Sequence, residues 1–248
     1  MKNLVNVFQD TLENSKNLTD STTSKHTFDE RNPPRLTMFK DIISVINTDS
    51  VSAVVEYSKL GKTCVLNMAS YKRPGGGVHN GARAQEECLF RCSNLIQVVP
   101  TSFYPLEENE ALYTKEAIFF KDKDYDYMDP ITCDVVTIAA LRLHGVIGED
   151  GEMSYESDVT DYRKITKDKI RLMVSLAAQN KVKNLILGAW GCGVFNNDPT
   201  TMAQYFSEVL IGEGYSVDFD NIVFAIINDH NSVGNNFDIF NNQFNANI

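Results

Sequence analysis

Two segments of the chain repeat one order of features: an apolar run, a glycine-rich turn and the start of a helix. In the first, residues 64–70 (CVLNMAS) lead to residues 75–77 (GGG) and then to residues 85–87 (QEE). In the second, residues 185–190 (LILGAW) lead to residues 191–193 (GCG). Open α/β sheets bind ligands outside the carboxyl ends of their strands. The two turns are therefore expected to meet in one crevice.

Outside these segments, short apolar runs alternate with helical patterns, which is typical of an α/β fold. The sequence predicts strands at 42–46, 64–68, 134–141, 184–189 and 222–227, and helices at 4–12, 50–57, 85–95, 161–179 and 237–244. Residues 112–120 are expected to be extended in a hairpin before the charged segment 121–126, and residues 144–158 to form a loop. Asp198 and Pro199 predict the N-cap and first position of another helix. The end of the chain is either the terminal helix or a frayed tail.

The length of the chain, 248 residues, suits one α/β domain with a large core. A polar stretch follows the first predicted helix and ends at Pro33-Pro34. We therefore expect residues 1–34 to be an arm or cap joined by a linker, and residues 35–248 to be the main domain. With 43% hydrophobic residues and no apolar run of membrane-spanning length, the chain is expected to be neither disordered nor transmembrane.

Cysteine count and charge limit the compartment and the partners. The five cysteines are an odd number and are widely scattered, and no apolar signal segment follows Met1. These features predict no disulfide framework and a reducing, cytoplasmic location. The net charge of −10 opposes a general affinity for nucleic acid or for an anionic membrane. A ligand that carries phosphate would therefore need local donors.

Three consecutive glycines remove every Cβ from the first turn. Backbone N–H groups can then touch a ligand, and positive φ angles become accessible, which suits an anion cradle. Neither turn has the Lys-Ser/Thr of a nucleoside-triphosphate loop or the Gly-x-Gly-x-x-Gly pattern, which argues against ATP hydrolysis and ordinary dinucleotide binding. A mobile surface loop is the alternative, and the carboxylate pair Glu86-Glu87 at the following helix start argues against it.

The pattern of Gly75-Gly76-Gly77, seven intervening residues and Gln85-Glu86-Glu87 resembles the signature of poly(ADP-ribose) glycohydrolases. Residues 188–195 (GAWGCGVF) resemble the diphosphate loop of the bacterial-type branch of that family. The resemblance implies a macrodomain-like α/β fold, a mixed sheet flanked by helices, with an N-terminal helical or flexible extension. In layout it covers about 35–244 and does not place the first 34 residues.

The resemblance makes Glu87 the general acid that then activates water, and Glu86 the carboxylate that orients ribose hydroxyls. Cleavage of a ribose–ribose bond needs protonation of the leaving oxygen and tolerance of an oxocarbenium-like centre. Because adjacent helical residues point about 100° apart, the two carboxylates would divide the work. A helix start favours ionised carboxylates, whereas a bound diphosphate, the charge of Glu86 and burial would favour a proton on Glu87. Simple stabilisation of the helix dipole is the alternative reading of the pair.

The resemblance also implies a set of substrate-binding residues: Asn67, Gly75, Gly76, Gly77, Val78, Gln85, Gly191, Cys192, Gly193, Val194 and Phe195. Within it, Phe195 packs on the distal ribose, and residues 191–194 offer N–H groups to the diphosphate. Some of these positions, and some outside the set, keep a second interpretation. Asn67 could instead cap its own turn, Cys192 suits a small buried residue better than a nucleophile, and His79 could contact phosphate or solvent. Asp49 could hold adenine, but an N-cap is favoured, and Trp190 is expected in the core.

The predicted activity is removal of terminal ADP-ribose units from poly(ADP-ribose), with ADP-ribose as product. Animal-type relatives have Asn before the Trp-Gly-Cys-Gly segment, where this chain has Ala189, and they carry extra segments for which this chain is too short. The alternatives are a mono-ADP-ribosyl hydrolase acting on a protein or nucleic-acid acceptor, and a non-catalytic ADP-ribose-binding module. We expect no cofactor and no metal, because the histidines have no ligand spacing and Cys88-x-x-x-Cys92 lacks partners. We expect no membrane partner and a monomer.

Overall fold

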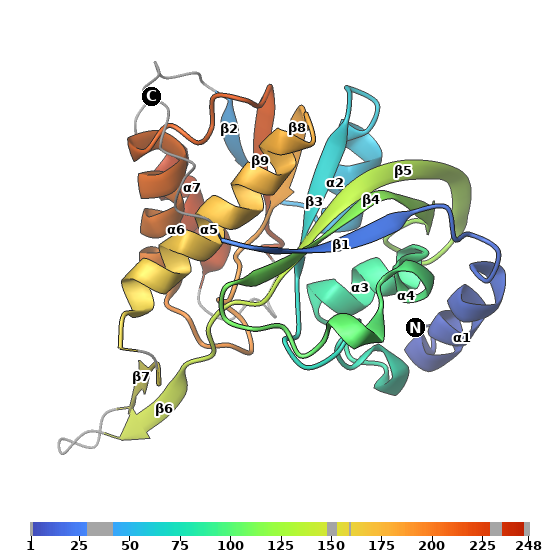
Figure 1. Ribbon diagram of the computed structural model, residues 1–248, viewed down its shortest axis with the longest axis horizontal. Helices are drawn as coiled ribbons and strands as arrows, with labels where there is room; N and C mark the ends of the chain where they lie inside the picture. The colour runs from blue at the N-terminus through green and yellow to red at the C-terminus, as the bar shows by residue number, and fades with distance from the viewer. Residues whose placement is uncertain (1, 29–41, 148–152, 159, 229–234, 246–248) are drawn as a thin grey trace.

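A computed structural model of the chain describes residues 2–28, 42–147, 153–158, 160–228 and 235–245. Its centre is a seven-stranded mixed sheet in the order β1-β4-β5-β3-β8-β9-β2 (Figure 1). The strands are β1 (Thr22–Thr27), β2 (Ile43–Ile46), β3 (Thr63–Met68), β4 (Glu110–Lys121), β5 (Tyr127–Ile138), β8 (Asn184–Leu187) and β9 (Asn221–Ala225). The five strands from β5 to β2 in this order are parallel, and β4 runs antiparallel to β5 and β1. The predicted mixed α/β sheet is confirmed.

Helices cover both faces of the sheet. They are α1 (Leu4–Asn14), α2 (Ser50–Tyr57), α3 (Gln85–Cys92), α4 (Leu95–Val98), α5 (Tyr162–Gln179), α6 (Pro199–Ser207) and α7 (Asn236–Asn245), with short turns η1 (Val78–Asn80), η2 (Thr101–Phe103) and the π-helical η3 (Glu208–Gly212). Figure 1 shows α1, α3 and α4 gathered at one side of the sheet and α5, α6 and α7 at the other. Two hydrophobic clusters, one on each face, follow this division.

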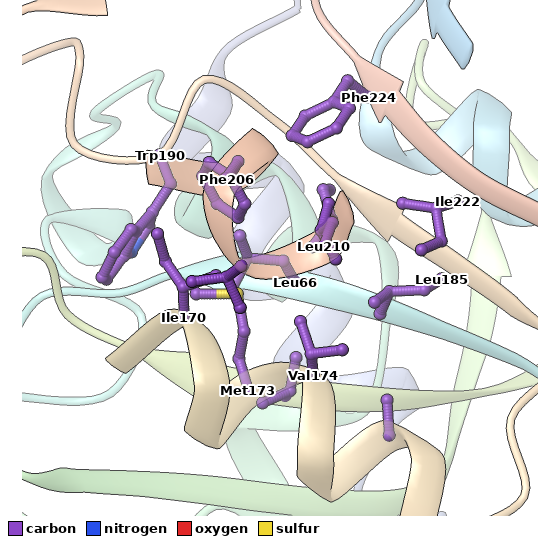
Figure 2. Close-up of a cluster of buried hydrophobic side chains, with 14 of the residues drawn as sticks. Leu66, Ile170, Met173, Val174, Leu185, Trp190, Phe206, Leu210, Ile222 and Phe224 are labelled. Atoms are coloured by element: carbon purple, nitrogen blue, oxygen red, sulfur yellow. The ribbon is translucent and has the colours of Figure 1, made fainter. Parts of the chain in front are cut away.

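The central strands are buried on both faces, which explains their continuous apolar sequences. In β8, Leu185 and Leu187 pack into the cluster beneath α5 and α6, while Ile186 faces the cluster beneath α2 and α3. Figure 2 shows the first cluster, in which Trp190 and Phe206 meet from different elements. The strand carboxyl ends are thus held rigidly at one edge of the sheet.

The polar segment that follows α1 departs from the prediction. Residues 22–27 were expected in a linker, but they form β1, which pairs antiparallel with β4 from Thr22↔Lys115 to Thr27↔Glu110. The strand is at the edge of the sheet and leaves part of its surface exposed, so it needs no apolar run. The expected domain boundary between residues 34 and 35 lies outside the described residues, and the division into 1–34 and 35–248 stays a prediction.

Helix α1 packs closely against the rest of the chain. Phe8 is fully buried, and the Nζ atom of Lys121 lies 2.6 Å from Oδ2 of Asp10 and 2.8 Å from Oγ1 of Thr11. Lys121 is itself almost completely buried, so its charge is compensated by α1. The N-terminal helix is therefore an integral layer beside α3.

The segment 144–158 was predicted as a loop and is instead mostly a hairpin. Strands β6 (His144–Ile147) and β7 (Met153–Glu156) pair antiparallel and project from the body of the molecule (Figure 1). Each strand has only four residues, and the glycines and acidic residues of 145–152 dominate the composition of the segment, which hides the strands from the sequence pattern.

All five cysteines are free thiols in the structure. Within the described residues, no helix combines the length and apolarity that a bilayer crossing requires.

Candidate active site

A cavity of about 610 Å³ lies at the carboxyl edge of the sheet. Its walls come from the segments that follow β2, β3, β5, β8 and β9, together with the first turn of α3. The residues that line it include Asp49, Lys72, Arg73, Gly76, Gly77, Gln85, Glu86, Glu87, Gly191, Gly193, Val194 and Phe195. Both glycine-rich turns thus reach one cavity, as the order of the two segments predicts.

Glu86 is held in place by three donors. Its Oε2 accepts a hydrogen bond from the Ser70 amide at 2.7 Å, and its Oε1 accepts one from the Gly75 amide at 3.1 Å. The Nδ2 group of Asn67 lies 3.4 Å from the same Oε1. The residue is 3% exposed. The carboxyl group is therefore fixed by the loop that precedes α3 and by the end of β3.

Glu87 accepts fewer hydrogen bonds than Glu86. Its Oε1 accepts a hydrogen bond from the Gly77 amide at 2.8 Å, while its Oε2 is buried and has no partner among the described residues. Because different amides hold Glu86 and Glu87, the two carboxyl groups are positioned independently. Glu87 thus lines the cavity and has one carboxyl oxygen that no described residue binds.

The first glycine turn surrounds the two carboxyl groups. Gly75 and Gly76 have φ angles of +71° and +52°, in the left-handed region that favours glycine. A Cβ at Gly76 would lie 2.7 Å from Oε1 of Glu87 and 2.9 Å from Oε2 of Glu86. The amides of Gly75 and Gly77 were expected to hold a ligand phosphate. Instead, the Gly75 amide donates to Glu86 and the Gly77 amide donates to Glu87.

Burial raises the pKa of Glu86 to about 8, and the negative charge of Glu87 adds to the shift. The hydrogen bonds from Ser70, Asn67 and Gly75 favour the charged form and oppose it. Near neutral pH, Glu86 therefore retains a proton in the ligand-free site. This proton on Glu86 lies beside Glu87, the residue that is expected to protonate the leaving group.

This pKa predicts how the Glu86→Gln variant responds to pH. The raised folded-state pKa means that the stability contributed by neutral Glu86 is fully present below about pH 4.5, its ordinary pKa, and is lost as pH rises through about 8. Glutamine cannot ionise, so the variant keeps this contribution. Urea unfolding at pH 5 and at pH 9 should show that wild type loses more unfolding free energy than the variant, by at least about 1.4 kcal/mol. Parallel pH profiles for the two proteins would contradict the assignment.

The second glycine turn has a different character. Gly191 has a φ of +81°, and a Cβ there would lie 2.7 Å from Nδ2 of the buried Asn197, which donates to the Gly191 carbonyl at 3.0 Å. The side chain of Asn197 therefore holds the turn in place. Within the described part of the chain, the N–H groups of Gly193, Val194 and Phe195 donate to no other residue. These N–H groups are therefore free to donate to a ligand.

Four other predicted site residues are placed behind the cavity or bonded to the scaffold. Asn67 is fully buried behind Glu86, and Val78 is fully buried in the cluster beneath α3, so neither is in the cavity wall. Gln85 lines the cavity, but its amide group binds the scaffold: Oε1 accepts from the Met68 amide at 2.9 Å and Nε2 donates to the Leu66 carbonyl at 2.6 Å. Cys192 is outside the cavity wall, and burial raises the pKa of its thiol to about 12, which argues against a nucleophile.

Three further residues that the sequence singled out make defined contacts. Asp49 is the N-cap of α2, with Oδ1 accepting from the Val51 amide at 2.9 Å, and it also lines the cavity. His79 is exposed and packs edge-on against Phe8, with ring centroids 4.9 Å apart. Trp190 is buried and donates from Nε1 to the Ile138 carbonyl at 3.1 Å. Asp49 therefore caps a helix, His79 lies away from the cavity, and Trp190 is in the core.

Sequence reasoning missed several cavity residues, chiefly the basic side chains of Lys72, Arg73 and Arg83. The signal was present, since Lys72-Arg73 directly precede Pro74 and the glycine turn. Among the described residues, no group of three or more His, Cys, Asp or Glu side chains is arranged to hold a metal ion. The polar chemistry of the cavity is thus that of two carboxyl groups, free backbone amides and a few cations.

Comparisons with known proteins agree with this geometry. The family model described as the microbial-type PARG catalytic domain matches residues 3–122, which include the first glycine turn and the carboxylate pair. No curated protein sequence matches the chain.

Among solved structures, a mutant of poly(ADP-ribose) glycohydrolase from Thermomonospora curvata is similar with a TM-score of 0.78 and 20% identity, covering 97% of this chain and 98% of that one. The enzyme from Deinococcus radiodurans in complex with ADP-ribose is similar with a TM-score of 0.72 and 21% identity, covering 100% and 99%. At these identities the structures show a shared fold. The resemblance of the sequence to the bacterial-type poly(ADP-ribose) glycohydrolases is therefore confirmed, by the family match over residues 3–122 and by the fold over nearly the whole chain.

Proposed function

We propose that this protein hydrolyses the ribose–ribose O-glycosidic bond at the terminus of poly(ADP-ribose) and releases ADP-ribose. The observation that carries the proposal is Glu87, a residue of the cavity wall whose buried Oε2 has no partner among the described residues, beside the carboxyl group of Glu86, whose pKa burial raises to about 8. The match to the microbial-type PARG catalytic domain supports the choice of bond.

Substrate binding uses the second glycine turn. The free N–H groups of Gly193, Val194 and Phe195 donate hydrogen bonds to the diphosphate, without a metal ion or a lysine. Phe195 stays in the cavity wall, where its ring packs against the distal ribose. Backbone donors of this kind also explain how a chain with a net charge of −10 binds a doubly charged ligand.

Bond cleavage uses the carboxylate pair. The diphosphate brings negative charge into the cavity, which favours the protonated form of a carboxylic acid there. Glu87 donates a proton to the leaving ribose oxygen as the glycosidic bond breaks, and the resulting carboxylate then takes a proton from the attacking water. Glu86, held by Ser70 and Gly75, orients the ribose hydroxyls.

Attack at the chain end predicts the products of a short digestion. Ala189 precedes Trp190, where animal-type relatives have Asn. Incubation with automodified polymer, with products resolved by size, should therefore give ADP-ribose and progressively shortened chains. Abundant free oligomers at early times would contradict terminal attack, and no released product at any time would contradict hydrolysis itself.

A reader without catalysis is the rival from another class. It would use the free amides of the second turn but would gain nothing from the unpartnered oxygen of Glu87. The same digestion separates the two, because a reader binds ADP-ribose and leaves the polymer intact.

A further inference from the structure

Two cations in the wall of the cavity have no partner of opposite charge among the residues that the structure describes. Lys72 and Arg73 are exposed, and both are in the cavity wall. Among the described residues, neither forms an ion pair with a carboxylate, whereas Lys121, Lys167 and Arg171 all do. The Nζ atom of Lys72 lies 5.5 Å from the ring centroid of Tyr71, a contact that leaves its charge unneutralised. These charges remain available to an anion.

Both cations belong to the chain segment that holds the carboxylate pair. They are in a segment that begins at Ser70, whose amide binds Glu86, and ends at Gly76, whose amide lies 3.4 Å from the Arg73 carbonyl oxygen. A Cβ at Gly76 would touch the carboxyl groups of both glutamates. Lys72 and Arg73 are thus at the reacting end of the cavity.

The order of the strands in the sheet indicates on which side of the scissile bond Lys72 and Arg73 lie. The free amides follow β8, the carboxylate pair is held by the segment after β3, and Asp49 follows β2. In the sheet, β3 is on one side of β8, and β9 and β2 are on the other. A ligand whose diphosphate binds after β8 and whose reacting ribose reaches Glu87 extends its leaving group toward the β3 segment.

We propose that Lys72 and Arg73 form a binding site for the diphosphate of the ADP-ribose unit on the leaving side of the bond. The proposal rests on the function proposed above. The two cations would make the polymer a better ligand than a single ADP-ribose. The arginine fork binds phosphate oxygens in pairs, and the lysine adds a point charge. The diphosphate of this second ADP-ribose unit carries the negative charge that Lys72 and Arg73 can neutralise.

Binding to a catalytically inactive protein tests the site directly. In the full chain carrying Glu87→Gln, we would measure Kd for ADP-ribose and for a dimer of two ADP-ribose units joined by the ribose–ribose bond. Adding Lys72→Gln and Arg73→Gln should weaken dimer binding by about tenfold and ADP-ribose binding by less than about twofold. A matched pair of exposed cations outside the cavity, Lys16→Gln with Lys59→Gln, should change neither.

Three results would overturn the proposal. The two ligands could lose affinity equally, which would place the cations on the terminal unit. Dimer binding could be unchanged. An unmodified single-stranded oligonucleotide could displace the dimer at comparable concentration, which would make the site a general nucleic-acid contact. Failure of the glycohydrolase proposal is seen separately, as intact polymer after incubation with the unmutated protein, while the dimer measurement still decides the role of Lys72 and Arg73.

Discussion

Replacing Glu87 by glutamine is expected to lower polymer turnover by at least about 10²-fold while ADP-ribose affinity stays within about tenfold. Glutamine preserves the shape of the side chain and can still accept the hydrogen bond from the Gly77 amide. It cannot donate a carboxylic proton or receive one back. The loss therefore falls on the chemical step, and steady-state kinetics on polymer together with calorimetry on ADP-ribose measure both quantities.

Two companion variants make the result specific. Glu86→Gln should weaken ADP-ribose binding as well as turnover, because Glu86 is assigned to orient ribose hydroxyls and its own position depends on Ser70 and Gly75. Glu13→Gln, an exposed position on α1, should change neither. If Glu87→Gln keeps most of the wild-type turnover, Glu87 is not the proton donor.

The sequence alone allowed prediction of the elements whose pattern is local. Strands such as β3 and β8 are buried on both faces and show as continuous apolar runs. The N-caps Asp49 and Asp198 and the proline at the start of α6 mark helix starts that the structure confirms. Because strands, turns and helix starts follow one another in the same order twice, the edge of the sheet that holds the cavity could also be predicted.

What escaped prediction depends on contacts between distant segments. Strand β1 is polar, and only its pairing with β4 makes it a strand. The amides of Gly75 and Gly77 bind Glu86 and Glu87 because the turn folds back onto α3, where the Phe90 ring would lie 2.8 Å from a Cβ at Gly75. Spacing specifies which residues share a turn. It does not specify which way an amide points.

A valine at position 76 is expected to lower turnover by at least about 10²-fold and ADP-ribose affinity by about tenfold. The added Cβ would lie 2.7 Å from Oε1 of Glu87 and 2.9 Å from Oε2 of Glu86, so both carboxyl groups must move. A β-branched residue also resists the φ of +52° that Gly76 adopts. Kinetics on polymer measures the first effect and calorimetry the second.

The position of Gly76 makes it possible to separate site damage from unfolding. Gly76 is in a partly exposed loop beside the cavity, so the variant should remain folded, and the rise in melting temperature on adding ADP-ribose should be smaller than in wild type. Gly212→Ala is the matched control, since a Cβ there meets nothing within 4 Å and its φ is not positive. It should leave turnover and the ligand-induced shift unchanged. Equal ligand-induced shifts in wild type and Gly76→Val, with turnover retained, would show that the carboxylate pair does not depend on the close approach of the glycine turn.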